Sequence, residues 1–218
     1  PGGFSEYIRV PSSWVVLKPE SLSLKNSMII GTAGLTAGLC VRAIEQKQSI
    51  KGLDAIISGA SGGVGSIAIK LLSKLGARVT AITGKPKLYS FLKNLGAQTI
   101  LDREDFLNSI KKPITKGSWD IAIDVVGGNM LSAILASMKY GGIVTCCGLV
   151  ESSTFKSSIF PFILKANQLI GIDSAETPLY IKKEIWKKFS NNWKLNNLEQ
   201  ISNVITLSEL SLEIKKIL

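Results

Sequence analysis

Short apolar runs alternate with amphipathic segments through most of the chain. Apolar runs bounded by Gly, Pro or charged residues predict buried strands, and segments with apolar positions three or four residues apart predict helices. This alternation indicates an α/β fold with a doubly wound parallel sheet covered by helices on both faces. Strands are expected at residues 54–58, 78–83, 99–101, 119–126, 143–147, 169–172 and 204–207. Helices are expected at residues 64–75, 86–95, 130–138, 178–193 and from residue 208 onward.

The first part of the chain has a different pattern. Residues 4–10 and 14–17 alternate like two short strands of a separate β structure. Ser27 is expected to cap a helix that runs to about Gln46 and carries many small residues, which let another backbone or a ligand approach closely. The apolar stretches are interrupted by Gly and by charged residues, so we expect no membrane span, which needs roughly 18 apolar residues or more.

Domain boundaries are expected near residues 25 and 200, where the pattern changes. Residues 26–200 would form the doubly wound domain, and residues 1–25 and 201–218 would belong to a second structure. The chain begins with Pro1 rather than Met and stops at Leu218 inside a helical pattern. We therefore interpret it as a piece of a longer fold, without a signal or transit peptide.

The absence of histidine excludes several kinds of site. A Ser-His-Asp triad, a Cys-His pair and a His-ligated zinc ion cannot be built from this chain. The three cysteines, Cys40, Cys146 and Cys147, are too few for a Cys₄ zinc site and do not form the pattern of a disulfide framework. We expect reduced thiols, no metal and a cytoplasmic location.

The charge balance favours an anionic partner. The chain has 26 Lys and Arg against 16 Asp and Glu, a formal net charge of +10. Nucleic acid, an anionic membrane and phosphate-bearing small molecules are the classes that such a surplus attracts. The basic residues occur in pairs rather than in runs of five or more, and no aromatic-rich RNA-binding signature accompanies them. We therefore expect a phosphate-bearing ligand, with neither nucleic acid nor a membrane as partner.

A glycine-rich turn, Ser58-Gly59-Ala60-Ser61-Gly62-Gly63-Val64-Gly65-Ser66, is the clearest motif. It follows an expected strand and opens an expected helix, which is the context of a dinucleotide-binding turn. Glycine there permits a tight turn, contact between backbone and pyrophosphate, and close packing of the helix on the strand. The glycine spacing differs from the common G-x-G-x-x-G, and a tight turn without a ligand is the alternative. No Gly-Lys-Ser/Thr follows, so a P-loop is not expected.

The end of the second strand of the doubly wound domain bears on the choice of cofactor. Enzymes that use NAD usually place Asp or Glu there, on the ribose 2′-hydroxyl. This strand ends in Thr83-Gly84-Lys85 and offers a hydroxyl, a backbone N–H and an ammonium, which suit a 2′-phosphate. Arg103, after the third strand, could add a second cation. The residues favour NADP(H), although Lys85 could also be an ordinary solvated lysine.

Ligands of open parallel sheets bind beyond the carboxyl ends of the strands. Gly127 and Gly148 would keep that crevice open. Leu149 could pack on a nicotinamide, and Ser174 could bond to its carboxamide or to ribose; ordinary loop roles are the alternative for both. Asp124, inside an apolar strand, is expected to make structural hydrogen bonds rather than to act in catalysis.

The order of motifs along the chain resembles the medium-chain dehydrogenase/reductase superfamily. Within it, the chain is similar to the zinc-free quinone oxidoreductase branch, and especially to its YhdH/YhfP-type, acryloyl-CoA reductase-like group. The resemblance covers the whole chain, and FPFIL followed by GIDS is its most group-specific part. The motifs are GTAGLTAG (31–38), SGASGGVGS (58–66), TGK (83–85), LGA (95–97), DVVGG (124–128), YGGIVTCCGL (140–149), FPFIL (160–164) and GIDS (171–174).

The resemblance implies a Rossmann domain at residues 26–200 that binds NADP(H). Residues 1–25 would be the end of a GroES-like catalytic domain, and residues 201–218 the start of the return into it. It further implies three groups of cofactor residues, and many relatives have Arg where Lys85 stands. The pyrophosphate would meet Ser61, Gly62, Gly63 and Val64; the 2′-phosphate end Thr83, Gly84, Lys85 and Arg103; and the nicotinamide side Leu149, Ile163 and Ser174.

Three hypotheses follow for the function. The first is an NADPH-dependent oxidoreductase that transfers hydride, without a metal, to an activated C=C such as that of an enoyl thioester like acryloyl-CoA, or to a quinone. The second is a truncated nucleotide-binding module without turnover. The third, suggested by the charge, is an RNA-binding or structural role. The small-molecule acceptor would be an enoyl-CoA or a quinone, a homodimer is left open, and no catalytic residue is assigned.

Overall fold

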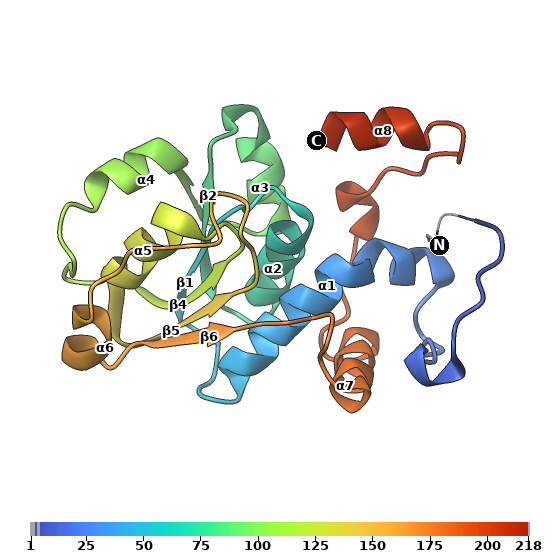
Figure 1. The fold of residues 1–218 in the computed structure, drawn as a ribbon, viewed down its shortest axis with the longest axis horizontal. Coiled ribbons are helices and arrows are strands. Elements are labelled where there is room, and N and C mark those ends of the chain that lie inside the picture. Colours follow the sequence, from blue (N-terminus) through green and yellow to red (C-terminus); the bar gives the residue numbers. More distant parts are fainter. Residues whose placement is uncertain (1–2, 4, 218) are drawn as a thin grey trace.

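The computed structural model describes residue 3 and residues 5–217, and its centre is a parallel sheet of six strands in the order β3-β2-β1-β4-β5-β6 (Figure 1). All neighbouring strands pair in parallel, so the predicted doubly wound α/β fold is confirmed. The order reverses between β1 and β4, which opens a crevice at their carboxyl ends. The strands are β1 Asp54–Ile57, β2 Arg78–Thr83, β3 Thr99–Asp102, β4 Trp119–Asp124, β5 Met138–Cys146 and β6 Gln168–Gly171.

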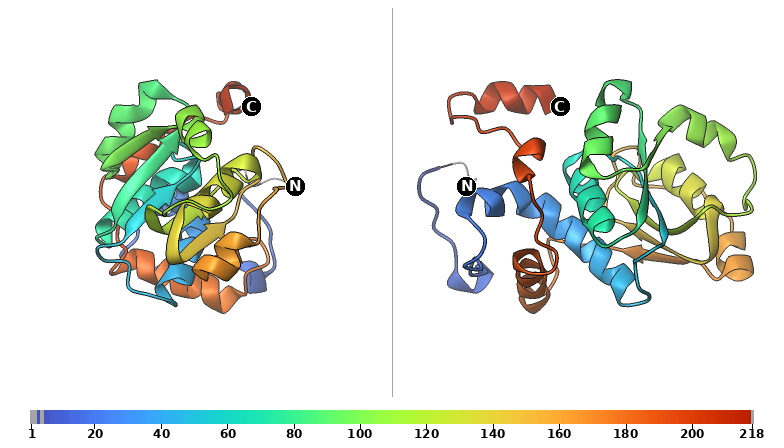
Figure 2. Two further views of the ribbon diagram at one scale, coloured as in Figure 1. Left: turned by 90° about the vertical axis from the view of Figure 1, so that its left-hand side faces the viewer. Right: turned by 180° about the vertical axis from the view of Figure 1, so that it is seen from behind.

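Helices cover both faces of the sheet (Figure 2). One apolar cluster lies between the sheet and helices α1, α2, α3 and α7, and a second lies between the opposite face and α4 and α5. The larger helices coincide with predicted ones within a few residues. The helices are α1 Leu24–Glu45, α2 Gly63–Lys74, α3 Tyr89–Leu95, α4 Arg103–Ser109, α5 Gly128–Ser137, α6 Phe160–Lys165, α7 Leu179–Ser190 and α8 Leu210–Ile217. Short 3₁₀ turns occupy Ser12–Trp14 (η1), Pro86–Leu88 (η2) and Leu198–Ile201 (η3).

Helix α1 begins earlier than predicted. Ser23, not Ser27, is its N-cap, because the Ser23 Oγ accepts a hydrogen bond from the backbone N–H of Asn26 at 3.0 Å. Gly31 interrupts the helix with φ 47° and ψ −152°, a conformation open to glycine. Gly38 lets α7 approach as predicted for the small residues, since a Cβ there would lie 2.7 Å from the Cγ2 of Ile185.

The prediction that no apolar stretch reaches the length of a membrane span was wrong for α1. This helix has 22 residues and an 18-residue window with a mean hydropathy of 1.5, so by length and composition alone it could cross a membrane. Half of that window is buried inside the protein. Its apolar residues therefore pack as a core helix against α2 and α7, with Ala37, Val41 and Ile44 inaccessible to solvent.

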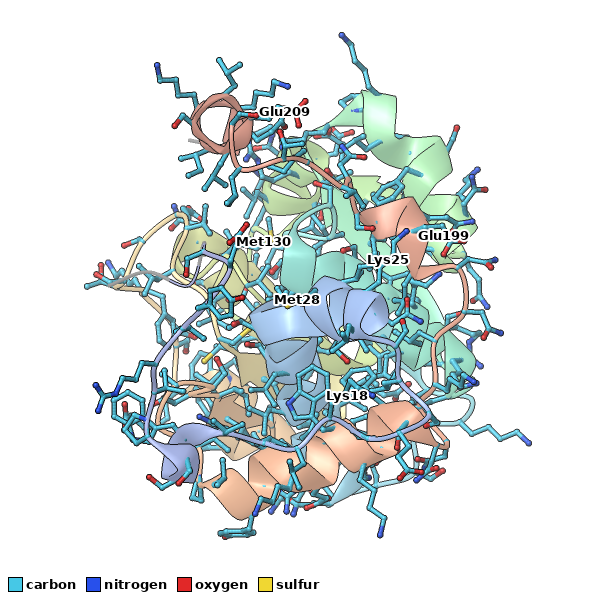
Figure 3. All side chains as sticks on the ribbon, turned by 90° about the vertical axis from the view of Figure 1, so that its right-hand side faces the viewer. Lys18, Lys25, Met28, Met130, Glu199 and Glu209 are labelled. Atoms are coloured by element: carbon cyan, nitrogen blue, oxygen red, sulfur yellow. The ribbon has the colours of Figure 1, made fainter. Side chains whose placement is uncertain are left out.

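The predicted strands outside the sheet do not form. Residues 5–10, 14–17 and 204–207 pair with no other strand among the described residues, and Phe4 lies outside those residues. Apolar side chains there face solvent, including Tyr7, Leu17 and Val204. Alternation of apolar and polar residues alone does not make a strand, because a strand needs a neighbouring strand with which to exchange backbone hydrogen bonds. Figure 3 looks at this end of the molecule, where Met28 on the first turns of α1 is also exposed.

An ion-pair network joins the amino ends of the central strands, opposite the crevice. Asp54 of β1 pairs with the Nε of Arg78 at 2.6 Å and with the Nζ of Lys139 at 2.5 Å. Lys139 also pairs with Asp120 of β4 at 3.0 Å. These contacts lower the pKa of Asp54 to about 2, chiefly through its hydrogen bond with Arg78. The network fixes the strand starts without occupying the crevice.

Candidate cofactor site

A cavity of about 760 Å³ lies at the carboxyl ends of the central strands. This volume is within the range of about 300–1,000 Å³ usual for small-molecule sites. Its wall combines the glycine turn after β1, the end of β2, the first turns of α4 and α5, and the segment after β5. The lining residues are Gly59, Ser61, Gly62, Ile82, Thr83, Gly84, Lys85, Arg103, Glu104, Leu107, Val125, Val126, Asn129, Met130, Val150 and Glu151.

The glycine turn can be built only with glycine at two positions. Gly59 has φ 54°, and a Cβ there would collide with the side chain of Val125. A Cβ at Gly65 would lie 2.7 Å from the Cα of Ala60, so its absence lets α2 pack closely on the turn. Gly62 is the N-cap of α2 and has no side chain to accept the first-turn N–H groups. Those N–H groups and the positive end of the helix dipole remain available for an anion such as a pyrophosphate.

Basic and hydroxyl groups gather at the end of β2. The Thr83 Oγ1 accepts a hydrogen bond from the backbone N–H of Lys85 at 3.2 Å, which holds the turn between them. A Cβ on Gly84 would lie 3.2 Å from the Cζ of Arg103, so the guanidinium lies directly beside this glycine. Both Lys85 and Arg103 line the cavity, and residues 83–85 at the end of β2 include no acidic residue. A phosphate on the 2′-oxygen of an adenosine fits this corner by charge.

An acid that was not predicted lies beside the two cations of this corner. Glu104 of α4 also lines the cavity, and its Oε1 lies 3.2 Å from the Nε of Arg103. Both side chains are more than half exposed, so this pair contributes little to stability. Arg103 keeps its terminal nitrogens for a ligand, since the pair uses Nε.

Asp124 plays the structural part expected of it. It accepts hydrogen bonds from the Ser58 Oγ at 2.5 Å and from the backbone N–H of Gly127 at 2.9 Å. The same Ser58 Oγ accepts from the N–H of Val125 at 3.0 Å. Burial raises the pKa of the Asp124 carboxyl above its ordinary value, against the opposing effect of these hydrogen bonds. The carboxyl thereby ties the end of β1 to the turn after β4, next to the lining residues Gly59 and Val125.

Six of the eleven predicted cofactor residues line the cavity. They are Ser61, Gly62, Thr83, Gly84, Lys85 and Arg103. Gly63 faces α1 instead, where a Cβ would lie 3.2 Å from the Cβ of Ala33, and Val64 packs against the core. Leu149 and Ile163 are largely exposed, and Ser174 is half-buried after β6. Contact of these five residues with a cofactor stays a prediction.

Several lining residues were missed. Glu104 and Leu107 belong to α4, which the sequence analysis did not predict. The signal for α4 was present, because Asp102 accepts from the N–H groups of Glu104 and Asp105 as a helix cap does. Asn129, Met130 and Glu151 follow the predicted strand ends by a few residues, and only the fold brings them to the same wall.

The family model for "Zinc-binding dehydrogenase" matches residues 63–191, more than half of the chain, from within the glycine turn through the five strands after it. The chain belongs to this family. The resemblance to medium-chain dehydrogenase/reductases is thus confirmed. Among the described residues no group of three or more His, Cys, Asp or Glu is arranged to hold a metal ion. That the whole protein works without zinc stays a prediction.

Three relatives place the chain more closely within the family. The yhdH oxidoreductase from Salmonella enterica, solved in complex with NADP, shares 40% identity at a TM-score of 0.93 over 99% of this chain and 66% of its own. The yhfP protein of Bacillus subtilis, solved with NAD bound, shares 38% identity at a TM-score of 0.95 over the same fractions. The acrylyl-CoA reductase AcuI of Ruegeria pomeroyi is 36% identical over 96% of this chain and 64% of its own. The chain therefore spans about two thirds of the length of these relatives.

Proposed function

We propose that this chain is the NADPH-binding part of an oxidoreductase that reduces an activated C=C, as in an enoyl thioester, or a quinone. The observation that carries the proposal is one cavity that joins a glycine turn at a helix N-terminus with two cations at the end of β2. A relative named as an oxidoreductase and solved with NADP, and another named as an acrylyl-CoA reductase, support it.

Each part of the cavity would bind one part of the cofactor. Ser61, Gly62 and the first turn of α2 would meet the pyrophosphate through backbone N–H groups. Lys85 and Arg103 would pair with the 2′-phosphate, and Thr83 and Gly84 would shape the pocket around it. Gly63 and Val64 would support the turn from behind. When bound, the nicotinamide would supply the hydride.

The nicotinamide side is proposed to lie toward Leu149, Ile163 and Ser174. Leu149 and Ser174 come from the segments after β5 and β6, beyond the carboxyl ends of the strands. Ile163 comes from α6, which precedes β6 and is joined to the start of β5 by the bond from Lys165 to the Met138 carbonyl, so the fold supports its place less than theirs. Their role would be to orient the nicotinamide and to keep water from the transferred hydride. No proton donor is assigned, and a cytoplasmic location and action without a metal belong to the proposal.

The test is the oxidation of NADPH, followed by its absorbance, with acrylyl-CoA and separately with 1,4-benzoquinone. Reduction of either acceptor supports the proposal and names the acceptor class. Saturable NADPH binding without turnover would instead support a nucleotide-binding module. RNA binding that falls with salt and that NADPH does not displace would favour the third hypothesis.

A further inference from the structure

The segment after β5 runs along the turn after β4. The N–H of Cys147 donates to the carbonyl of Asp124 at 3.0 Å, and the N–H of Glu151 donates to the carbonyl of Val126 at 2.9 Å. Gly127 and Ser152 form an isolated parallel bridge. Residues 147–152, here named the β5 loop, therefore extend the pairing of β4 and β5 beyond the sheet and form one wall of the cavity.

Two glycines allow the β5 loop and the turn after β4 to come into direct backbone contact. A Cβ at Gly148 would lie 2.8 Å from the Cα of Val125, and a Cβ at Gly127 would lie 3.2 Å from the carbonyl oxygen of Gly148. The backbones of the two segments are therefore in direct contact. Any shift of the β5 loop would move Leu149 and Val150 relative to the cavity.

The side chain of Glu151 fastens this loop to a helix. Its Oε1 accepts from the N–H of Asn129 and its Oε2 from the N–H of Met130, both at 3.2 Å. These are first-turn N–H groups of α5, whose N-cap, Gly127, has no side chain to satisfy them. A Cβ at Gly128 would lie 2.7 Å from the Glu151 Cδ, so only a glycine leaves room for the carboxylate.

Glu151 also stands between two cavities. It and Asn129 line both the cofactor cavity and a neighbouring cavity of about 400 Å³ that residues of the 152–156 segment close on the other side. Glu151 thus borders both spaces. An anion held by two N–H groups at a helix N-terminus is in a favourable position.

We propose that Glu151 is a positioning residue: by capping α5 it fixes the β5 loop, and with it the wall that orients the nicotinamide half of the cofactor. This rests on the proposed function. The opposing expectation is simple repulsion, in which a carboxylate beside the cavity disfavours the cofactor phosphates and its removal tightens binding. Replacement of Glu151 therefore weakens NADPH binding if the residue positions the loop, and strengthens it if simple repulsion dominates.

The first experiment tests, without any cofactor, whether the Glu151 carboxylate protects the first-turn N–H groups of α5. Hydrogen–deuterium exchange of the first-turn amides of α5 is compared in the wild type, in Glu151→Gln and in Glu151→Ala, with Glu20→Gln, an exposed residue before α1, as control. We expect exchange about tenfold faster in the Ala variant, less in the Gln variant, which keeps one acceptor oxygen, and no change in the control. Unchanged exchange in both Glu151 variants would overturn the proposal.

The second experiment separates the two halves of the cofactor. Dissociation constants are measured for NADPH and for adenosine 2′,5′-bisphosphate, which lacks the nicotinamide half, together with the emission of bound NADPH. In Glu151→Ala we expect NADPH to bind about tenfold more weakly, because the freed β5 loop no longer holds the wall for the nicotinamide half, with its emission moved toward that of free NADPH. The bisphosphate should bind as in the wild type.

Unchanged or tighter NADPH binding would contradict the positioning role, and so would equal weakening of both ligands. A wild-type protein that binds neither ligand would overturn the proposed function, and the role of Glu151 in cofactor binding with it. The exchange experiment would then still show whether Glu151 caps α5.

Discussion

The guanidinium of Arg103 lies beside Gly84, with its Cζ 3.2 Å from the point where a Cβ of residue 84 would be. Arg103 is the first residue of α4, directly after β3, and Gly84 directly follows β2. Because β2 and β3 are paired in parallel, their carboxyl ends place both residues at one corner of the cavity. Lys85 completes this corner. Under the proposed function, the positive charge of this corner would distinguish NADPH from NADH, because only NADPH has a phosphate on the adenosine 2′-oxygen.

Replacement of both cations tests this corner. In Lys85→Ala/Arg103→Ala we expect NADPH binding to weaken by about 2–4 kcal/mol, as for two lost charge-assisted hydrogen bonds, and NADH binding to stay nearly unchanged. Lys87→Ala is the control, since Lys87 is exposed in η2 and lies outside the cavity lining. Isothermal titration measures both cofactors, and equal losses for NADPH and NADH would show that these residues do not bind the 2′-phosphate.

Two adjacent glycines of the turn should respond differently. Gly62 lines the cavity with φ −82°, a conformation open to any residue, although a Cβ there would lie 3.3 Å from the carbonyl oxygen of Gly59. Gly62→Val should therefore remove dinucleotide binding and lower the melting temperature only slightly. Gly63 faces Ala33 of α1, so Gly63→Val should lower the melting temperature by overpacking that contact. Thermal unfolding and NADPH titration of both variants check this. Full affinity in a folded Gly62→Val protein would mean that the turn is only structural.

The pKa of Asp54 gives a pH dependence of stability. Its folded pKa is lowered from 3.8 to about 2, so the ionised carboxylate stabilises the folded state above pH 3.8. That contribution falls as the pH drops through the window from about 4 to 2. Asp54→Asn should cost about 1 kcal/mol at pH 7, allowing for solvent screening, and only a small fraction of that at pH 2, where the carboxyl is about half protonated in the folded state. Urea unfolding at both pH values measures it, with Glu20→Asn as control; an equal cost at the two pH values would contradict the ion-pair account.

Removal of the Ser58 hydroxyl should loosen the link between the end of β1 and the turn after β4. The buried Oγ donates to Asp124 and accepts from the N–H of Val125, so Ser58→Ala leaves two polar groups without this partner. We expect a loss of about 1–3 kcal/mol in the free energy of unfolding. Ser90→Ala, at an exposed position on α3, is the control. A variant as stable as the wild type would show that the Ser58 hydroxyl is replaceable.

The sheet was predictable because its strands are short apolar runs and four of them, β1, β2, β4 and β6, are followed by helices that the sequence pattern also predicts. The register of β1, β2 and β4 buries Ile56, Ile57 and Ile123 completely, as continuous apolar runs require. Residues 5–10 and 14–17 have a strand-like alternation too, but pairing is a property of two segments, and no partner strand is present among the described residues.

The cavity was predictable only in part. Glycine and charge at the ends of β1 and β2 are local signals, and they lead to Gly62 and Lys85 directly. Glu151 gives no local signal, because its importance comes from the N–H groups of Asn129 and Met130, more than twenty positions earlier in the chain. Such contacts follow from the approach of the β5 loop to α5, which the folded sheet determines.

Titration of the wild-type chain with NADPH and with NADH under identical conditions tests the central claim most directly. We expect saturable binding of both cofactors at one site, with NADPH at least about tenfold tighter, because one charge-assisted contact to the 2′-phosphate already contributes that much. The preference should shrink as salt is raised, since part of it is electrostatic. Equal affinity for the two cofactors, or tighter binding of NADH, would contradict the assignment of Lys85 and Arg103 to the 2′-phosphate.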